Sequence, residues 1–252
     1  MADLEKKGTP AAPTGQADGA LTDELQEKLK SLDKESNTME YAGICGKIVA
    51  ALCICFSLFQ IYTGIFGTLD AMIQRCVHLS FGISLVFLLC PTKKSWIKGG
   101  RFHPIDILFT VLAVIPPVYI LLNYQQLILR AGTVTPTDAV VGLLGIVMVL
   151  EAARRIVGLP IVIVVLCFLL YGFLGPYMPG PLAHRGLTIN QMVGHLFFTT
   201  EGVFGIPLGV SSTFIFLFIL FGAYLEKTGL GKFFIDIANA LEIGRASCRE
   251  RV

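Results

Sequence analysis

The chain carries little charge for its length. Charged residues make up 15% of its 252 residues and hydrophobic residues make up 54%, whereas a typical soluble domain has about 25% charged residues. This balance indicates that lipid is the main solvent and favours an integral membrane protein. No basic surface with interleaved aromatic residues exists outside the apolar runs, so the sequence does not support nucleic-acid binding.

Motifs of the common enzyme classes are also missing. There is no GxSxG, no HExxH and no Walker loop, and the four histidines are dispersed without ligand-like partners in sequence. The seven cysteines are scattered, mostly inside apolar runs; Cys53 and Cys55 form a lone near-pair, which we interpret as coincidence. We therefore expect no enzyme, no metal site and no cofactor. An ATP-driven pump is not supported either, so a transporter of this sequence would by default use an ion gradient.

A cleavable signal peptide is absent from the start of the chain. Residues 1–40 are polar, with nine acids and five bases, and contain no apolar core. Composition predicts disorder over residues 8–20, and a short amphipathic helix over residues 22–36, capped by Thr22. We expect a cytoplasmic, largely disordered tail whose helix is solvated or lies against the membrane.

Long apolar runs follow this tail. Six of them come near the roughly 20 residues that a membrane-spanning helix needs: residues 44–66, 76–90, 105–123, 138–157, 159–174 and 204–225. Between the last two, apolar residues fall at helical spacing over residues 189–197, which predicts an amphipathic helix in the membrane interface. The expected fold is an all-α integral membrane protein with about six transmembrane helices, one interfacial helix and a polar N-terminal tail.

Basic residues orient these helices. The loop over residues 92–103 has four bases and no acid, so we expect it in the cytoplasm. Counting helices from this loop places the N-terminus, Arg154, Arg155, Lys227 and Lys232 on the same side. All basic clusters therefore agree on a multi-pass protein of the cell inner membrane with a cytoplasmic N-terminus.

Three local signals refine this picture. Thr135 and Asp138 predict a capped start for the fourth helix, and Pro116-Pro117 predicts a kink in the third. Gly205 and Gly209, four residues apart at the start of the sixth helix, predict close approach to a neighbouring helix.

The corner between the fourth and fifth helices concentrates charge. Glu151 stands four residues before Arg155 and three before Arg154, and the tight turn with Gly158 and Pro160 follows at once. Such spacing favours an internal ion pair. Two interpretations stay open: a topology anchor that also binds lipid phosphates, and a rigid joint that couples two membrane domains.

Four more ionisable residues lie at the ends of predicted helices. Arg75 and His78 are functional candidates because ionisable groups are rare in membrane segments, although snorkelling at a helix end also explains them. Asp106 opens the third helix, where an N-terminus favours an acid. Glu201 precedes the sixth helix and is a candidate for lining an external vestibule.

Several short landmarks in this order carry a resemblance. They are Gln74-Arg75 with His78-Leu79, Leu88–Pro91, Leu150–Arg155 with Gly158, Tyr171–Gly175 with Pro179-Gly180, Glu201–Gly205, and Phe221–Ala223 with Gly229–Phe234. Over residues 41–241 the chain resembles the N-terminal part of a fused permease of the tripartite ATP-independent periplasmic (TRAP) transporters. The type it resembles is the one served by TAXI-class binding proteins.

The resemblance implies a division of labour. Residues 41–157 would be a scaffold like the small membrane subunit, and residues 158–241 would begin the large transporting subunit. Such a permease imports organic acids with sodium by an elevator-like motion, after a periplasmic TAXI-type binding protein delivers them. The family's sodium and substrate sites lie in glycine-rich hairpins beyond this sequence, so no ligand is assigned to any residue here. Expected partners are that binding protein, membrane lipid and the C-terminal remainder of the permease.

The last residues, 242–252, break the apolar pattern with three arginines. Their codons can be written as a sequence that resembles a sequencing-library adapter, so we expect them to be an artefact and the permease to continue beyond Leu241. Reading the source DNA across the codon of Glu242 tests this expectation.

Two rival functions remain for the sequence. A different secondary carrier or channel would need intramembrane acids in later helices, and a non-transporting scaffold would need a natural stop near Leu241. A membrane enzyme comes third, because no pattern of nucleophile and base or of metal ligands is present.

Overall fold

A computed structural model describes residues 41, 43–92, 103–130 and 132–249, with side chains as far as residue 240. Within these ranges all regular secondary structure is helical and there is no strand, which confirms the all-α prediction. The predicted tail helix over residues 22–36 and nearly all of the basic loop lie outside the described residues.

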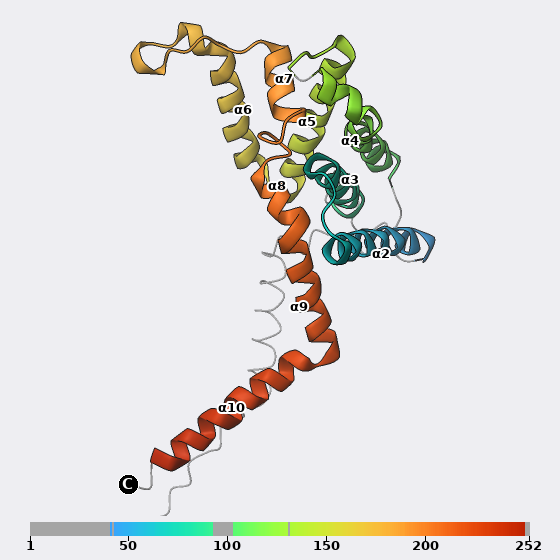
Figure 1. Ribbon diagram of the computed structural model, residues 1–252, viewed down its shortest axis with the longest axis vertical. Helices are drawn as coiled ribbons and strands as arrows, with labels where there is room; N and C mark the ends of the chain where they lie inside the picture. Colours follow the sequence, from blue (N-terminus) through green and yellow to red (C-terminus); the bar gives the residue numbers. More distant parts are fainter. Residues whose placement is uncertain (1–40, 42, 93–102, 131, 250–252) are drawn as a thin grey trace, which may run out of the picture. The chain divides into compact units, whose positions relative to one another are not determined.

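The helices follow one another along the chain (Figure 1). In chain order they are α2 (Gly43–Phe66), α3 (Ala71–Leu89), α4 (Pro104–Leu129), α5 (Pro136–Ile156), α6 (Leu159–Leu174), the 3-10 turns η3 (Gly175–Tyr177) and η4 (Gly180–Leu182), α7 (Ile189–Phe197), α8 (Ile206–Val210), the π-helical η5 (Ser211–Ile215), α9 (Phe216–Thr228) and α10 (Leu230–Arg249). An extended loop with the two 3-10 turns separates α6 from α7.

Five helices in the described residues are long and apolar enough to cross a membrane. They are Gly43–Phe66, Ala71–Leu89, Pro104–Leu129, Leu159–Tyr177 and Ile206–Thr228. The sequence predicted six. The predicted fourth span forms helix α5, which is not among the five and carries an acid in its first turn and two arginines in its last.

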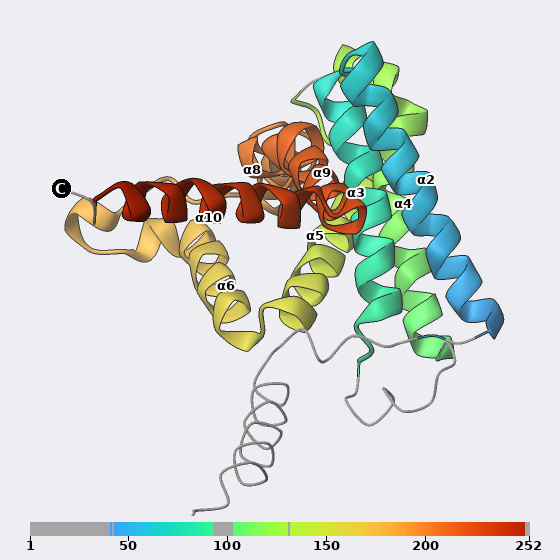
Figure 2. The same ribbon diagram turned by 90° about the horizontal axis from the view of Figure 1, so that it is seen from below.

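Helices α2, α3 and α4 run alongside one another, and α3 packs against α4 and α5 as well as α2 (Figure 2). One apolar cluster, with Phe87 and Ala113 among its buried residues, joins α3, α4 and α5. A second cluster joins the same helices to α7 and includes Ile120 and the fully buried Phe197. Apolar side chains on adjacent helix faces therefore hold α3, α4 and α5 together, which places their ends next to one another.

The predicted amphipathic helix is α7, and its apolar face packs on α5. Val193 and Phe197 are fully buried there, over Gly142 and Gly145 of α5. A Cβ atom at Gly145 would lie 2.2 Å from Phe197 Cζ. Small residues on α5 thus let α7 approach closely, and the protein itself covers the face that the sequence assigned to the membrane interface.

The predicted start of α5 is confirmed, and α4 has a backbone irregularity that the sequence did not predict. Thr135 and Asp138 form a reciprocal capping box. Asn123 has non-helical φ/ψ inside α4, and Pro116-Pro117 lie within the same helix. The Asn123 side chain donates to the Tyr119 carbonyl at 3.0 Å and so competes for a helical acceptor.

Candidate functional site

The Arg155 side chain forms the most connected polar cluster in the described residues. Although it lies in the last turn of α5, only 2% of the side chain is exposed. Nη1 donates to Asp106 Oδ1 at 2.8 Å and to the Cys90 carbonyl at 3.0 Å. Nη2 donates to Thr92 Oγ1 at 2.8 Å, and Nε to Glu151 Oε1 at 3.0 Å. One guanidinium therefore ties together the end of α3, the start of α4 and the end of α5.

The groups around Arg155 offset the free-energy cost of burying its charge. Its guanidinium carbon lies 4.6 Å from the ring centre of Phe87 and 5.0 Å from that of Phe109, within the range of cation–π attraction. Its partner Asp106, whose side chain is 6% exposed, also accepts from Thr92 Oγ1 at 2.7 Å. A buried ion pair is tolerated when further hydrogen bonds complete it, and this cluster meets that condition.

Two titratable neighbours of the cluster are held in their neutral forms. Burial, with the charge of Asp106 as a smaller cause, raises the pKa of Tyr41 to about 12; the Tyr41 hydroxyl donates to the Leu88 carbonyl at 2.5 Å. Burial also raises the pKa of the Cys90 thiol, although the positive charge of Arg155 opposes this. The cluster therefore presents neither a thiolate nor a phenolate nucleophile, and its role is structural. We call Arg155 with its partners Cys90, Thr92, Asp106 and Glu151 the Arg155 clamp.

The other residues predicted at this corner surround the clamp. Arg154 binds Glu151 through two hydrogen bonds of 2.6 and 2.7 Å, and its side chain is 37% exposed. The structure thus contains both ion pairs that the spacing allowed. Gly158 precedes α6 with φ of +108°, and Pro160 is exposed in the first turn of that helix. Sequence reasoning missed Asp106 as a partner, because no local signal links it to Arg155, 49 residues away.

Arg75 and His78 lie in a second cluster, between α2, α3 and the segment around η5. His78 is 7% exposed; its Nδ1 contacts Gln60 Nε2 and its Nε2 contacts Ser211 Oγ at 3.2 Å. Arg75 Nη1 donates to the Phe204 carbonyl at 2.6 Å. Both side chains therefore make hydrogen bonds within the protein. Snorkelling toward a membrane surface is not needed to explain why ionisable residues occur here.

Glu201 lies apart from both clusters. Its side chain is 72% exposed and comes within 3.6 Å of His195 Nδ1.

Gly209 lies close to a neighbouring helix, as its spacing predicted: a Cβ atom there would lie 2.7 Å from Nη2 of Arg75 on α3. The absence of a side chain at Gly209 is what admits the arginine.

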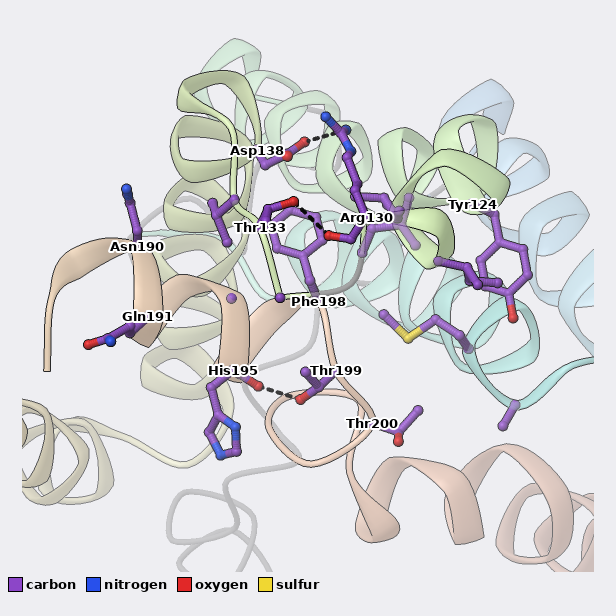
Figure 3. A pocket seen from close by; sticks show the side chains of 18 of the residues that line it. Tyr124, Arg130, Thr133, Asp138, Asn190, Gln191, His195, Phe198, Thr199 and Thr200 are labelled. Atoms are coloured by element: carbon purple, nitrogen blue, oxygen red, sulfur yellow. Dashed lines mark hydrogen bonds and ion pairs between the residues drawn. The ribbon is translucent and has the colours of Figure 1, made fainter.

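A cavity of about 710 Å³ opens between the start of α3, the end of α4, the start of α5 and helix α7 (Figure 3). Its polar lining comes from Asp70, Tyr124, Arg130, Thr133, Asp138, Asn190, Gln191, His195, Thr199 and Thr200. Met72, Ile120, Leu127 and Phe198 are among its apolar residues. Sequence reasoning did not find this cavity, because four separate segments form it.

Charges in this cavity are largely paired with one another. Arg130 Nη2 lies 3.2 Å from Asp138 Oδ1 (Figure 3). Asp138, which is 1% exposed, also accepts from the Tyr119 hydroxyl at 2.6 Å and from Thr135 Oγ1 at 2.7 Å. In the described residues the buried Arg130 Nε has no hydrogen-bond partner, and no group of three His, Cys, Asp or Glu side chains is placed to hold a metal ion. The cavity thus shows no catalytic constellation.

Comparison with protein families gives one finding. Residues 144–247 match the family described as DctM, the DctM component of the tripartite ATP-independent periplasmic transporters. This segment, less than half of the chain, is thus similar to a transporter's membrane permease component and not to an enzyme. The match begins within α5 and ends inside residues 242–252, which the sequence pattern sets apart. Comparisons with curated proteins and with solved structures gave no match.

Proposed function

We propose that this chain is a membrane permease component of a TRAP transporter. The observation that carries the proposal is the match of residues 144–247 to the DctM component, in a chain with five helices suited to cross a membrane. In this proposal residues 41–157 form the small-subunit-like scaffold, and residues 158–241 begin the transporting part. The transporter imports organic acids with sodium across the cell inner membrane, and a periplasmic binding protein of the TAXI type delivers them.

The Arg155 clamp is more than a topology anchor, but it lies wholly within residues 41–157 and so stiffens the scaffold side of the corner rather than bridging the two proposed domains. An anchor needs only basic side chains near lipid phosphates, and the partly exposed Arg154 meets that need. Arg155 is instead buried, and its partners Asp106 and Thr92 precede the matched segment in sequence. It therefore fixes the end of α5, directly before the proposed transporting part, to the end of α3 and the start of α4. No ion or substrate ligand is assigned to a residue of this chain.

A chimera tests the transport role. Residues 41–241 replace the corresponding part of a fused TRAP permease of the TAXI type, and the chimera is reconstituted in proteoliposomes with that permease's own binding protein. We expect uptake of the labelled organic acid that depends on an inward sodium gradient. The 252-residue chain alone, in matched proteoliposomes, is expected to show none. A folded chimera without sodium-dependent uptake would favour a different carrier or a non-transporting scaffold.

Alkaline phosphatase fusions test the orientation. In the proposed topology α5 also crosses the membrane, as the sequence predicts, although it is not among the five helices that are long and apolar enough by composition. The enzyme folds only outside the cytoplasm, so a fusion after Gly132 is expected to be active and one after Val157 inactive. The reverse pattern would show that the basic corner faces outward and would overturn the proposed topology. Western blots of both fusions control for expression.

A further inference from the structure

The helix that begins at Ile206 contains an irregular turn. Residues Ser211–Ile215 form the π-helix η5 between α8 and α9. In a continuous α-helix the Phe216 N–H would donate to the Ser212 carbonyl, four residues earlier. It donates instead to the Ser211 carbonyl, five residues earlier. The Ser212 carbonyl has therefore lost its α-helical donor.

A side chain from another helix supplies a donor to this carbonyl. Gln74 Nε2, on α3, donates to the Ser212 carbonyl at 2.8 Å. Both residues are buried, Gln74 at 2% and Ser212 at 1% exposure. The other end of the Gln74 amide accepts from the Leu69 N–H at 3.2 Å, which fixes which atom of the amide faces η5. Because no water is available in a membrane interior, a carbonyl left without a donor there is strongly unfavourable.

The contacts after η5 depend on this turn. Phe216 packs on Phe56 of α2 with ring centres 4.5 Å apart. At Gly64, also on α2, a Cβ atom would lie 2.9 Å from Leu217 Cδ1. A π-turn adds one residue to a helix, so removing it would rotate the two flanking helices relative to each other by about 100° and shift them by about 1.5 Å. Neither contact with α2 would survive that change.

We propose that Gln74 is a positioning residue that holds η5 in its π form and thereby sets the rotational register of α9 against α2. His78 adds a weaker hold through Ser211 Oγ at 3.2 Å. The register itself is a property of this chain alone. Its consequence for transport rests on the proposed function, because α9 lies within the DctM-like segment.

The full chain in lipid nanodiscs provides the test, with spin labels introduced as unnatural amino acids at Ala51 and Phe218, both of which are exposed. Gln74→Met removes the donor and keeps the length of the side chain. We expect this variant to move the label on α9 by roughly 8 Å, as a rotation of about 100° at the radius of a helix surface implies. Ser84→Ala is the matched control, because Ser84 is a buried polar residue of α3 that bonds only within its own helix. This control should leave the distance between the spin labels at Ala51 and Phe218 unchanged.

Deletion of Ser212 separates register from general damage. Removing one residue from the π-turn leaves a continuous α-helix with α9 in its original register, so the deletion should keep the original distance and make Gln74→Met silent. An unchanged distance in Gln74→Met alone would overturn the inference, and so would a shifted distance in the deletion variant. If Gln74→Met does not fold, the double variant decides: it should fold with the original distance, and its failure refutes the inference. None of these distances depends on transport activity.

Discussion

Replacement of Arg155 by methionine should be among the most destabilising single changes at the corner between α5 and α6. It leaves the buried Asp106 carboxylate without its charged partner, and removing one member of a buried pair typically costs about 3–5 kcal/mol. Thr92 Oγ1 still donates to Asp106 at 2.7 Å, so we expect a loss at the lower end, about 3 kcal/mol. For a chain of this size that corresponds to a fall in Tm of about 6–12 °C.

The assay is thermal denaturation in nanodiscs, followed by circular dichroism. Arg154→Met is the matched control: this side chain is 37% exposed and pairs only with Glu151, so it should cost less than about 1 kcal/mol. In a double-mutant cycle, Asp106→Asn with Arg155→Met should cost less than the sum of the two single changes, because the double variant leaves no buried charge unpaired. Equal losses for the two arginines, or strict additivity in the cycle, would refute the clamp.

Three further changes can be followed by the same assay. Gly145→Ala should cost about 1–3 kcal/mol because its Cβ would overlap the Phe197 ring, whereas Gly82→Ala, with open space around it, should be near neutral; similar losses for both would contradict the proposed packing of α7. Gly158→Ala should cost about 1–3 kcal/mol because only glycine readily adopts φ of +108° with ψ of −178°, and a silent variant would show that this turn is not required. Thr135→Ala should cost about 1 kcal/mol by removing the capping box, while Thr135→Ser should retain most of it.

Features with a local cause could be predicted from the sequence. Apolar runs place the helices because burial in lipid is favourable over a fixed length, and the capping box at Thr135 depends on residues three apart. The pairing of Glu151 with Arg154 and Arg155 also follows from helical spacing. These signals need no knowledge of how the helices pack.

Partners far apart in the sequence could not be predicted in the same way. Asp106 meets Arg155 only because α3, α4 and α5 pack with these ends together. Gln74 donates to the carbonyl of Ser212, which is 138 residues away in the sequence, and no residue pattern predicts a π-turn. The apolar stripe of α7 predicts a helix in the membrane interface, because the sequence cannot show that Gly142 and Gly145 pack against this stripe.

The two ends of α5 suggest where the rigid part of the chain stops. At its start the buried Asp138 pairs with Arg130 from the end of α4, and at its end Arg155 pairs with Asp106 from the start of α4. Helix α5 is thus fixed to α4 by an ion pair at each end, and six of its residues are buried. Helix α6, directly after Gly158, has no buried residue. If the proposed transport involves motion between two membrane domains, we propose that the boundary lies at Gly158 and not at residue 144, where the DctM-like segment begins. We then expect α5 to stay with the scaffold while the helices after Gly158 move.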